Sequence, residues 1–535
     1  MITRPQKMPR LLVALIASMT ALAVSSQEAR VRPQLVVGIV IDGLDSQYID
    51  LLRNHFGSGG FNRLLRDGVV LANADYGTNV DATAATAMLM TGASPSTTTI
   101  TSAESYDREA LRCTPVLLDA ASAGQYTDET LSAAPLAVST LSDEVRIAGG
   151  GVTRVYGVAP DAQQAILLAG HSGNCALWIN SRNGNWASSR YYRDVPSSVG
   201  SRNRLEPLSL RLDTISWTPL RGPETYSSLP DHVTRYPFRH TFSRGSAGVF
   251  DRFKSSAMAN REVLDMASRL IDEQKLGEND GLDMLNLAFT VKPYDYTVSD
   301  DNRYELIDSY LRLDGNLEQL FSKIDGKLGS GSVLYFVAAT PPTGRSRRDD
   351  EKWGIPYGEF STKKAVSLLN MYLMATYGNG DWISSYHDGQ FYLNHKLIGQ
   401  LNLEPDRVRA AAAQFLAKMS GVDHVYTIDE VLAGRGDAHL EAMQRNSHPS
   451  TSGDLFVEVD PGWEVVDDIT SPAGKDRIHY VKRLATATAP VFIMAPDVDP
   501  RVIDTPVDIR VVAPTVARLL RIRSPNGAAL PSMVL

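Results

Sequence analysis

The stretch LVVGIVID at residues 35–42 decides the fold class. A continuous apolar run of this length is typical of a parallel strand that helices cover on both faces. Two later segments, DMLNLAFTVKPYD (283–295) and SVLYFVAAT (332–340), show the same character. Ligands of open α/β sheets bind outside the carboxyl ends of the strands. Asp42 and Asp295, which end two of these runs, are therefore candidate site residues.

Short apolar runs alternate with amphipathic stretches along most of the chain, which predicts an α/β fold with a mostly parallel central sheet between helical layers. We expect further strands at 153–159 and 490–496, and helices at 261–277, 304–325 and 407–419. Two regions break the alternation, and we expect them to be insertions that cap the carboxyl edge of the sheet. They lie at about 172–250 and 345–455.

The N-terminus has the pattern of a secretory signal peptide: a basic start, the apolar run LLVALIASMTALAV, and then small residues. We predict a signal peptide at 1–26, with cleavage after Ser26 preferred over Ala23, and a folded domain at 33–535. The alternative is an uncleaved anchor, although the apolar run is short for a spanning helix. We expect an exported, periplasmic protein that is not integral to the membrane after cleavage.

Composition is ordinary for a folded protein, with 43% hydrophobic and 21% charged residues. The net charge of −8 and the lack of a long basic block argue against nucleic acid as a partner. The two cysteines, Cys113 and Cys175, either form a disulfide or are separate thiols. Two cysteines alone cannot build a structural zinc site.

The order of several segments resembles the alkaline phosphatase superfamily, most closely its type I phosphodiesterase/nucleotide pyrophosphatase-like branch of exported bacterial alkaline phosphatases with a threonine nucleophile. The resemblance covers nearly everything after the signal peptide and implies a three-layer α/β sandwich with inserted cap segments. It rests on VVGIVIDGL (36–44), GGFNRLLRDGVVLANADY (59–76), TGASP (91–95), AILLAGHSGNCALWI (165–179), DSYLRLDGNLEQLFSKID (308–325), KKAVSLLNMYLMATYGNGDWI (363–383), SGDLFVEVDPGW (452–463) and APTVARLLRIRSPNGA (513–528).

The resemblance implies two zinc ions at the strand ends, a threonine nucleophile, and an Asn with a Lys/Arg pair on the phosphoryl oxygens. In this chain the nucleophile position is Ala82, which carries no oxygen, and the adjacent Thr83 is a weak replacement. The Asn position is Ala103. The Lys and Arg positions are Asp161 and Gln163, so a carboxylate stands where a phosphate would be held.

The metal positions retain Asp42, Asp295 and His479, whereas the remaining ligand positions hold other residues, Thr86, Ser299 and Thr340-Pro341. We interpret the three retained residues as vestigial metal ligands.

Each retained residue also has an alternative interpretation. Asp42 could accept backbone hydrogen bonds at a turn, and Asp295 could pair with Lys292. Ser299, Asp300 and Asp301 could build an oxygen-rich site for calcium or magnesium.

These substitutions predict an exported, non-catalytic protein of the cell envelope with the fold of a hydrolase, a pseudoenzyme that binds an envelope protein or a ligand. We expect no cofactor, or at most one weakly bound Zn, Ca or Mg ion. The alternative is a residual or rewired metal-dependent phosphohydrolase or phosphodiesterase that uses Asp42, Asp295 and His479. A third hypothesis is a lectin-like or nucleotide-binding module at the same edge of the sheet.

Overall fold

The computed structural model describes residues 32–535 apart from 79, 227–236, 295, 297–301, 342–353, 355–357, 435, 468–477 and 481–487. The predicted signal peptide and Asp295 therefore lie outside the described residues, as do Ser299, Asp300 and Asp301. Of His479 the structure describes only the backbone.

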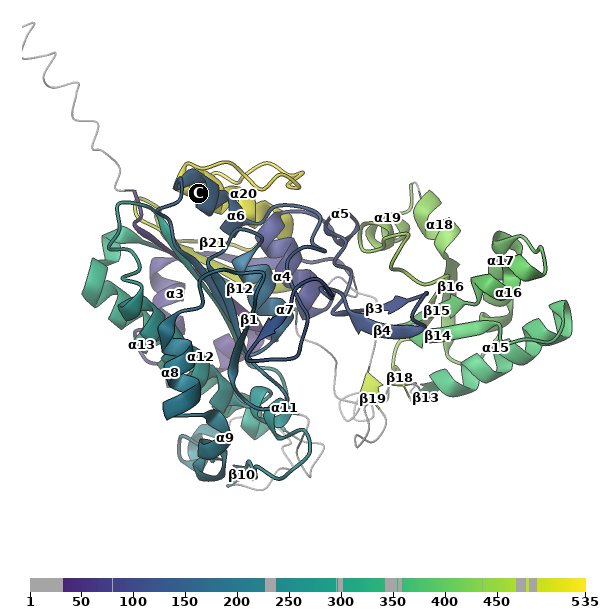
Figure 1. Cartoon of the computed structure of the whole chain (residues 1–535), viewed down its shortest axis with the longest axis horizontal. Helices are drawn as coiled ribbons and strands as arrows, with labels where there is room; N and C mark the ends of the chain where they lie inside the picture. Colours follow the sequence, from purple (N-terminus) through teal and green to yellow (C-terminus); the bar gives the residue numbers. More distant parts are fainter. Residues whose placement is uncertain are drawn as a thin grey trace, which may run out of the picture.

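An eleven-stranded sheet forms the centre of the molecule (Figure 1). Strand β1 lies near its middle and pairs in parallel with β11 on one side and β12 on the other. The antiparallel pairs involve β20, β8 and β5, so the sheet is mostly parallel. The strand order is β21 (Arg501–Ile503), β2 (Val69–Asp75), β20 (Thr488–Met494), β12 (Val333–Ala339), β1 (Leu35–Asp42), β11 (Asp283–Thr290), β6 (Val155–Val158), β7 (Cys175–Ile179), β8 (Trp186–Ser189) and β5 (Gly124–Gln125), with β22 (Val507–Asp508) beside β2.

Two groups of helices pack against this sheet and bury it. Strand β11 contacts helices of both groups, so the sheet is the middle of three layers, as predicted. One group contains α4 (Ala82–Thr91), α5 (Pro95–Thr98), α6 (Leu141–Ala148), α7 (Ala162–Ala169) and α20 (Val512–Leu520). The other contains α2 (Ser46–Leu52), α8 (Ser197–Leu205), α11 (Val249–Lys254), α12 (Ala257–Glu273) and α13 (Arg303–Leu328). The short α3 (Phe61–Asp67) packs on β20.

Every residue of β1 is buried, in agreement with its continuous apolar sequence. In parallel register, Asp42 stands beside Thr290 of β11, and Ile41 stands beside Ala339 of β12. The carboxyl ends of three adjacent strands therefore meet at one place on the sheet edge.

A smaller lobe forms beside the main body, drawn in green in Figure 1. It has its own hydrophobic core, which includes Phe360, Leu369 and Trp382. Its elements are β13 (Gly358–Ser361), α15 (Thr362–Tyr377), β14 (Ile383–His387), β15 (Gln390–Leu393), α16 (His395–Gln400), α17 (Pro405–Leu416), β16 (Val422–Thr427), α18 (Ile428–Ala433), α19 (Ala438–Arg445), β17 (Leu455–Val459), β18 (Trp463–Asp467) and β19 (Ile478–Tyr480). The predicted boundaries of the inserted segments remain a prediction.

The region 172–250 contributes both to the sheet and to its periphery. Its first strands, β7 and β8, extend the central sheet, and Trp178 and Trp186 are buried in the main core. The later part forms α9 (Leu208–Arg211), α10 (Pro223–Tyr226) and the small pair β9 (Ser216–Trp217) and β10 (His240–Thr241). Tyr192, Trp217 and Phe242 of this region are also buried in the main core.

Cys113 and Cys175 both lie in the described part of the chain, and no disulfide joins them. Within the described ranges, no helix combines the length and the hydrophobicity that crossing a bilayer requires.

Candidate functional site

Asp42 lies at the carboxyl end of β1 with its side chain only 9% exposed. The Thr340 hydroxyl, just beyond β12, donates a hydrogen bond to its carboxylate at 2.6 Å. The same hydroxyl accepts from the backbone N–H of Gly43 at 3.2 Å. Lys292, two residues beyond β11, places its Nζ 2.5 Å from the other Asp42 oxygen. The three strand ends thus converge on one carboxylate that is already hydrogen-bonded and neutralised.

A second ion pair lies beside the first. Lys254, near the end of α11, has its Nζ 2.7 Å from Asp161, which precedes α7, and 3.5 Å from Asp251. Burial acts to lower the pKa of Lys254, but the attraction of Asp161 outweighs burial and the pKa is raised. Asp161 is the residue that the sequence predicted at a phosphate-binding lysine position, and a lysine from another helix compensates its charge.

The two ion pairs line a cavity of about 100 Å³. This space is enough for about three water molecules. The buried side-chain amide nitrogen of Gln164 has no hydrogen-bond partner among the described residues, although Gln164 lines the cavity. A buried donor of this kind calls for a partner such as a water molecule or a ligand oxygen. The lining residues are Asp42, Pro160, Asp161, Gln164, Asp251, Lys254, Ser255, Phe289, Thr290 and Lys292.

The predicted nucleophile position, Ala82, is the first residue of α4. Asp81 caps this helix, accepting hydrogen bonds from the N–H of Ala84 at 2.8 Å and of Ala103 at 2.6 Å. Burial raises the pKa of Asp81 to about 6 against these hydrogen bonds. Thr83 is buried at 7% exposure. The first residue of α4 therefore offers only a methyl group, and the neighbouring Asp81 carboxylate is hydrogen-bonded to backbone N–H groups.

Gln163, at the other substituted phosphate-binding position, also serves the backbone. Its amide donates to the Ala103 carbonyl at 2.8 Å and its Oε1 accepts from Leu117 N–H at 3.1 Å. Ala103 is thus held by Asp81 on its N–H and by Gln163 on its carbonyl. The positions that the sequence predicted for phosphate contacts thus form a hydrogen-bonded scaffold in this chain.

Two of the predicted metal ligands are not placed together by the structure. Asp295 is outside the described residues. His479 belongs to β19, which pairs with β18 in a small separate sheet, and its side chain is not described. The interpretation of Asp42, Asp295 and His479 as a metal site therefore remains a prediction.

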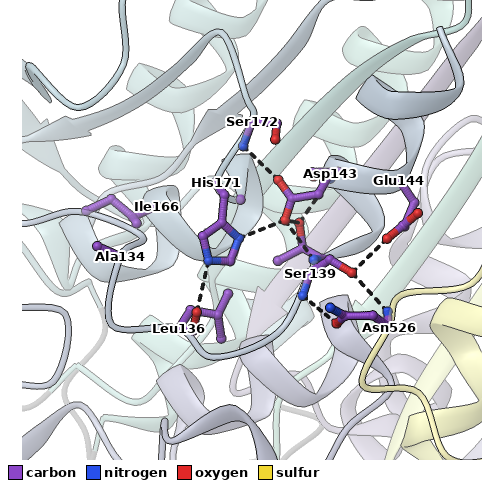
Figure 2. A network of polar contacts seen from close by, with 12 residues as sticks. Ala134, Leu136, Ser139, Asp143, Glu144, Ile166, His171, Ser172 and Asn526 are labelled. Carbon is purple, nitrogen blue, oxygen red and sulfur yellow. Dashed lines mark hydrogen bonds and ion pairs between the residues drawn. The ribbon is translucent and has the colours of Figure 1, made fainter. Parts of the chain in front are cut away.

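His171 is held by two structural contacts. Its Nδ1 lies 3.0 Å from Asp143 Oδ2, and its Nε2 lies 2.9 Å from the Leu136 carbonyl (Figure 2). Asp143 also binds the backbone N–H groups of Thr140 and Ser172. This network joins the loop before α6 to the end of α7.

The pairs Lys292–Asp42 and Lys254–Asp161 were not predicted from the sequence, which offered Asp295 as an alternative partner of Lys292. The partners of the second pair lie 93 residues apart in the sequence. No local pattern marks such a pair, because it depends on how a helix from one region meets a strand end from another.

Comparisons with known proteins give a consistent result. The family model for type I phosphodiesterase/nucleotide pyrophosphatase matches residues 36–483. Alkaline phosphatase PafA of Elizabethkingia meningoseptica is 26% identical, with 93% of each chain covered. A protein of Myroides odoratus named calcium-transporting ATPase is 28% identical, with 94% of this chain and 95% of the relative covered. The crystal structure of wild-type PafA has a TM-score of 0.83 at 25% identity, covering 94% of this chain and 98% of that one.

These relatives correct one expectation. The expectation of no cofactor is wrong, because the relatives matched over nearly the whole chain include alkaline phosphatases, and phosphatases act through metal ions held in paired sites. The expectation rested only on the side chains missing at individual ligand positions.

The described residues nevertheless do not form a two-metal site at the strand ends. Among the side chains that the structure describes, Asp42 is the one predicted as a metal ligand, and Lys292 and Thr340 occupy its two oxygens. A cation bound there would have to displace the Lys292 ammonium, which already supplies the charge that the carboxylate requires.

Proposed function

We propose that the chain, which belongs to the type I phosphodiesterase/nucleotide pyrophosphatase family within the alkaline phosphatase superfamily, uses the phosphohydrolase fold for binding. In this proposal the protein binds a ligand or a partner protein and is not a catalyst, so none of its residues accepts a phosphoryl group.

The Lys292–Asp42 ion pair is the observation that carries this proposal. A threonine nucleophile needs a cation beside it, because an alcohol is a weak nucleophile at neutral pH. In this chain the carboxylate that would hold such a cation is paired with lysine, and Ala82 offers only a methyl group at the start of α4. The cation and the hydroxyl group that an activated threonine nucleophile requires are therefore both replaced.

The cavity supports binding of a small polar group better than of a phosphate dianion. Three carboxylates line it, from Asp42, Asp161 and Asp251, against two ammonium groups, from Lys254 and Lys292. The excess negative charge repels a dianion. The Gln164 amide, buried and without a partner in the described structure, supplies a donor for a ligand oxygen.

An activity assay tests the proposal directly. The full chain is incubated with aryl phosphate monoesters and diesters while zinc, calcium or magnesium is supplied, and an Asp42→Ala variant purified in parallel controls for contaminating phosphatases. We expect the two proteins to show the same background rate. Turnover in the parent protein that Asp42→Ala abolishes would overturn the proposal.

The second candidate is a residual or rewired metal-dependent phosphohydrolase or phosphodiesterase that uses Asp42, Asp295 and His479. The comparisons favour it, because relatives named alkaline phosphatases align with almost the whole chain. The same assay separates the two candidates, since only this one predicts metal-stimulated turnover that depends on Asp42.

We also propose a periplasmic location and an envelope protein as partner. The N-terminal sequence supports export, and the acidic net charge of −8 disfavours nucleic acid. Osmotic-shock fractionation tests the location, and a cytoplasmic marker pattern would contradict it. Cross-linking in intact cells tests the partner. A discrete larger species is expected, and recovery of the monomer alone would count against it.

A further inference from the structure

A short hairpin connects the main body to the smaller lobe (Figure 1). It consists of β3 (Glu104–Asp107) and β4 (Arg112–Pro115), and β3 contacts β14 of the lobe. Glu104, Cys113 and His387 meet at this junction, with one ligand atom from each lying within 4.8 Å of the other two. We propose that these three residues form a zinc site of this chain, at positions separate from the metal positions of the family.

The chemistry of the three ligands favours zinc. A thiolate and an imidazole are ligands for zinc and other transition metals, whereas calcium and magnesium prefer oxygen ligands alone. One carboxylate with a Cys and a His gives three protein ligands. Three protein ligands leave a fourth tetrahedral position for water, as in zinc sites that remain open to solvent.

The observed spacing requires only a small adjustment. Ligand atoms around tetrahedral zinc lie about 3.5 Å apart, given metal–ligand bonds of roughly 2.0–2.3 Å. The ligand atoms here all lie within 4.8 Å of one another, so an ion would draw the side chains together by no more than about 1 Å. Glu104 is exposed and can rotate to close this gap.

Contacts around the three residues hold the β3–β4 hairpin against the smaller lobe. Tyr106 stands opposite Cys113 in the hairpin, and its ring lies 4.9 Å from that of Tyr392 in β15. Arg108, in the turn that follows β3, reaches the buried Asp454 of the lobe at 3.0 Å. Rigid support for the backbone keeps metal ligands close to their binding geometry.

His387 is fixed by the turn between β14 and β15. It pairs with Gln390 across the hairpin, and both central residues, Asp388 and Gly389, have positive φ values of 45° and 75°. A two-residue turn with two positive φ angles sets the register of a hairpin. The imidazole is therefore carried on a defined strand end that faces the β3–β4 hairpin.

The site lies next to the scaffold around the former nucleophile position. Glu104 directly follows Ala103, whose N–H is bound by Asp81 at the start of α4. A metal at the hairpin would therefore lie near the family's phosphate-binding segment without using the family's ligands. The inference does not depend on whether the protein hydrolyses phosphate esters.

Metal loading of the full chain tests the inference. The protein is purified with a phosphine reductant, stripped with a chelator and reloaded with zinc or with cobalt(II). We expect one equivalent of zinc by elemental analysis. We also expect a thiolate-to-cobalt charge-transfer absorption, which only a bound cysteine produces.

Variants then assign the ligands. Cys113→Ser should abolish the absorption, and both Cys113→Ser and His387→Gln should weaken zinc binding by at least ~10-fold. Cys175→Ser is the matched control, because that thiol is buried beside Ser188 and should leave the absorption intact. Circular dichroism verifies that each variant is folded.

Two results would overturn the zinc site. The first is the absence of the charge-transfer absorption in the parent protein after cobalt loading, which requires no variant. The second is metal binding that survives Cys113→Ser and is lost in Asp42→Asn, which would assign the ion to the family's site.

Discussion

Asp143 is a buried carboxylate whose two oxygens are shared among several donors. Burial acts to raise its pKa, but hydrogen bonds from His171, Thr140 and Ser172 outweigh burial, and its pKa is lowered. The same contact with Asp143 raises the pKa of His171, against the opposing effect of burial. The pair is thus most strongly bound when both groups are charged.

The stability of the fold should depend on His171 in one pH window. Because the pKa of His171 is raised in the folded state, the imidazole stabilises the fold. This stabilisation is complete below the pKa of the unfolded state, about 6.5, and is lost as pH rises through the pKa of the folded state. Replacing His171 with Ala should therefore lower the free energy of unfolding by about 2 kcal/mol near pH 5.5, and by less near pH 9. Urea unfolding of both proteins across this range measures the difference.

His424→Ala is the matched control for this prediction. His424 is 61% exposed on β16, and its nearest carboxylate, Asp423, is 4.0 Å away. A surface pair of this kind contributes little. A pH-independent cost for His171→Ala, or an equal pH dependence for His424→Ala, would contradict the assigned ion pair.

Substitutions at aligned positions were readable from sequence, whereas the new partners of the remaining side chains were not. The resemblance assigned Ala82 to the nucleophile position, and the structure places Ala82 at the start of α4. Lys254 gave no signal, because its partner Asp161 belongs to a distant part of the chain. Motif spacing identifies what a position has lost, and three-dimensional contacts are needed to see what replaces it.

Among the elements, long apolar or amphipathic segments were predictable and short polar ones were not. The predicted strand 35–42 coincides with β1, and the predicted helix 304–325 lies within α13, Arg303–Leu328. The hairpin of β3 and β4 was missed, because four-residue strands with sequences ESYD and RCTP lack a hydrophobic period. Its conformation depends on packing against the lobe.

Arg108 should hold this hairpin against the smaller lobe. Its guanidinium binds Asp454 at 3.0 Å and the Ser452 carbonyl at 3.1 Å, and it lies 5.2 Å from the Tyr392 ring centre. We expect Arg108→Ala to destabilise this contact by about 1–3 kcal/mol, since the buried Asp454 keeps its charge and is left with His395 and Arg409 as partners. Hydrogen exchange should then accelerate in β3, β4 and β14.

Arg66→Ala provides the comparison for Arg108→Ala. Arg66 pairs with Asp67, and both side chains are exposed, at 59% and 42%. The Arg66→Ala substitution should lower the free energy of unfolding by less than about 0.5 kcal/mol and leave hydrogen exchange in the hairpin unaltered. If Arg108→Ala behaves like Arg66→Ala, the hairpin is held by its aromatic contacts alone.

At the scale of the whole molecule, the described residues form two main hydrophobic cores of different size, besides a small cluster of Val431, Met443 and Phe456. The larger surrounds the central sheet, and the smaller lies inside the lobe. The three-layer body was predictable, because its strands and helices alternate in order. The packing of the lobe was not, because its strands come from separated segments such as β14 and β17.

The two cores should respond separately to mutation. Leu369 in α15 is fully buried in the lobe core, and Leu320 in α13 is fully buried in the main core. Truncating either to Ala removes similar volume, at a cost of about 2–4 kcal/mol. Because the smaller core buries fewer apolar side chains and opens more readily, we expect Leu369→Ala to accelerate exchange in the lobe and leave β1, β11 and β12 protected.

Segment-resolved hydrogen exchange measures both variants under native conditions. Leu320→Ala should accelerate exchange in the central strands, because its side chain packs in the core that buries them. The lobe's own amides should be less affected, since their protection depends on the smaller core. Equal acceleration in lobe and body by either variant would mean that the two cores unfold as one cooperative unit.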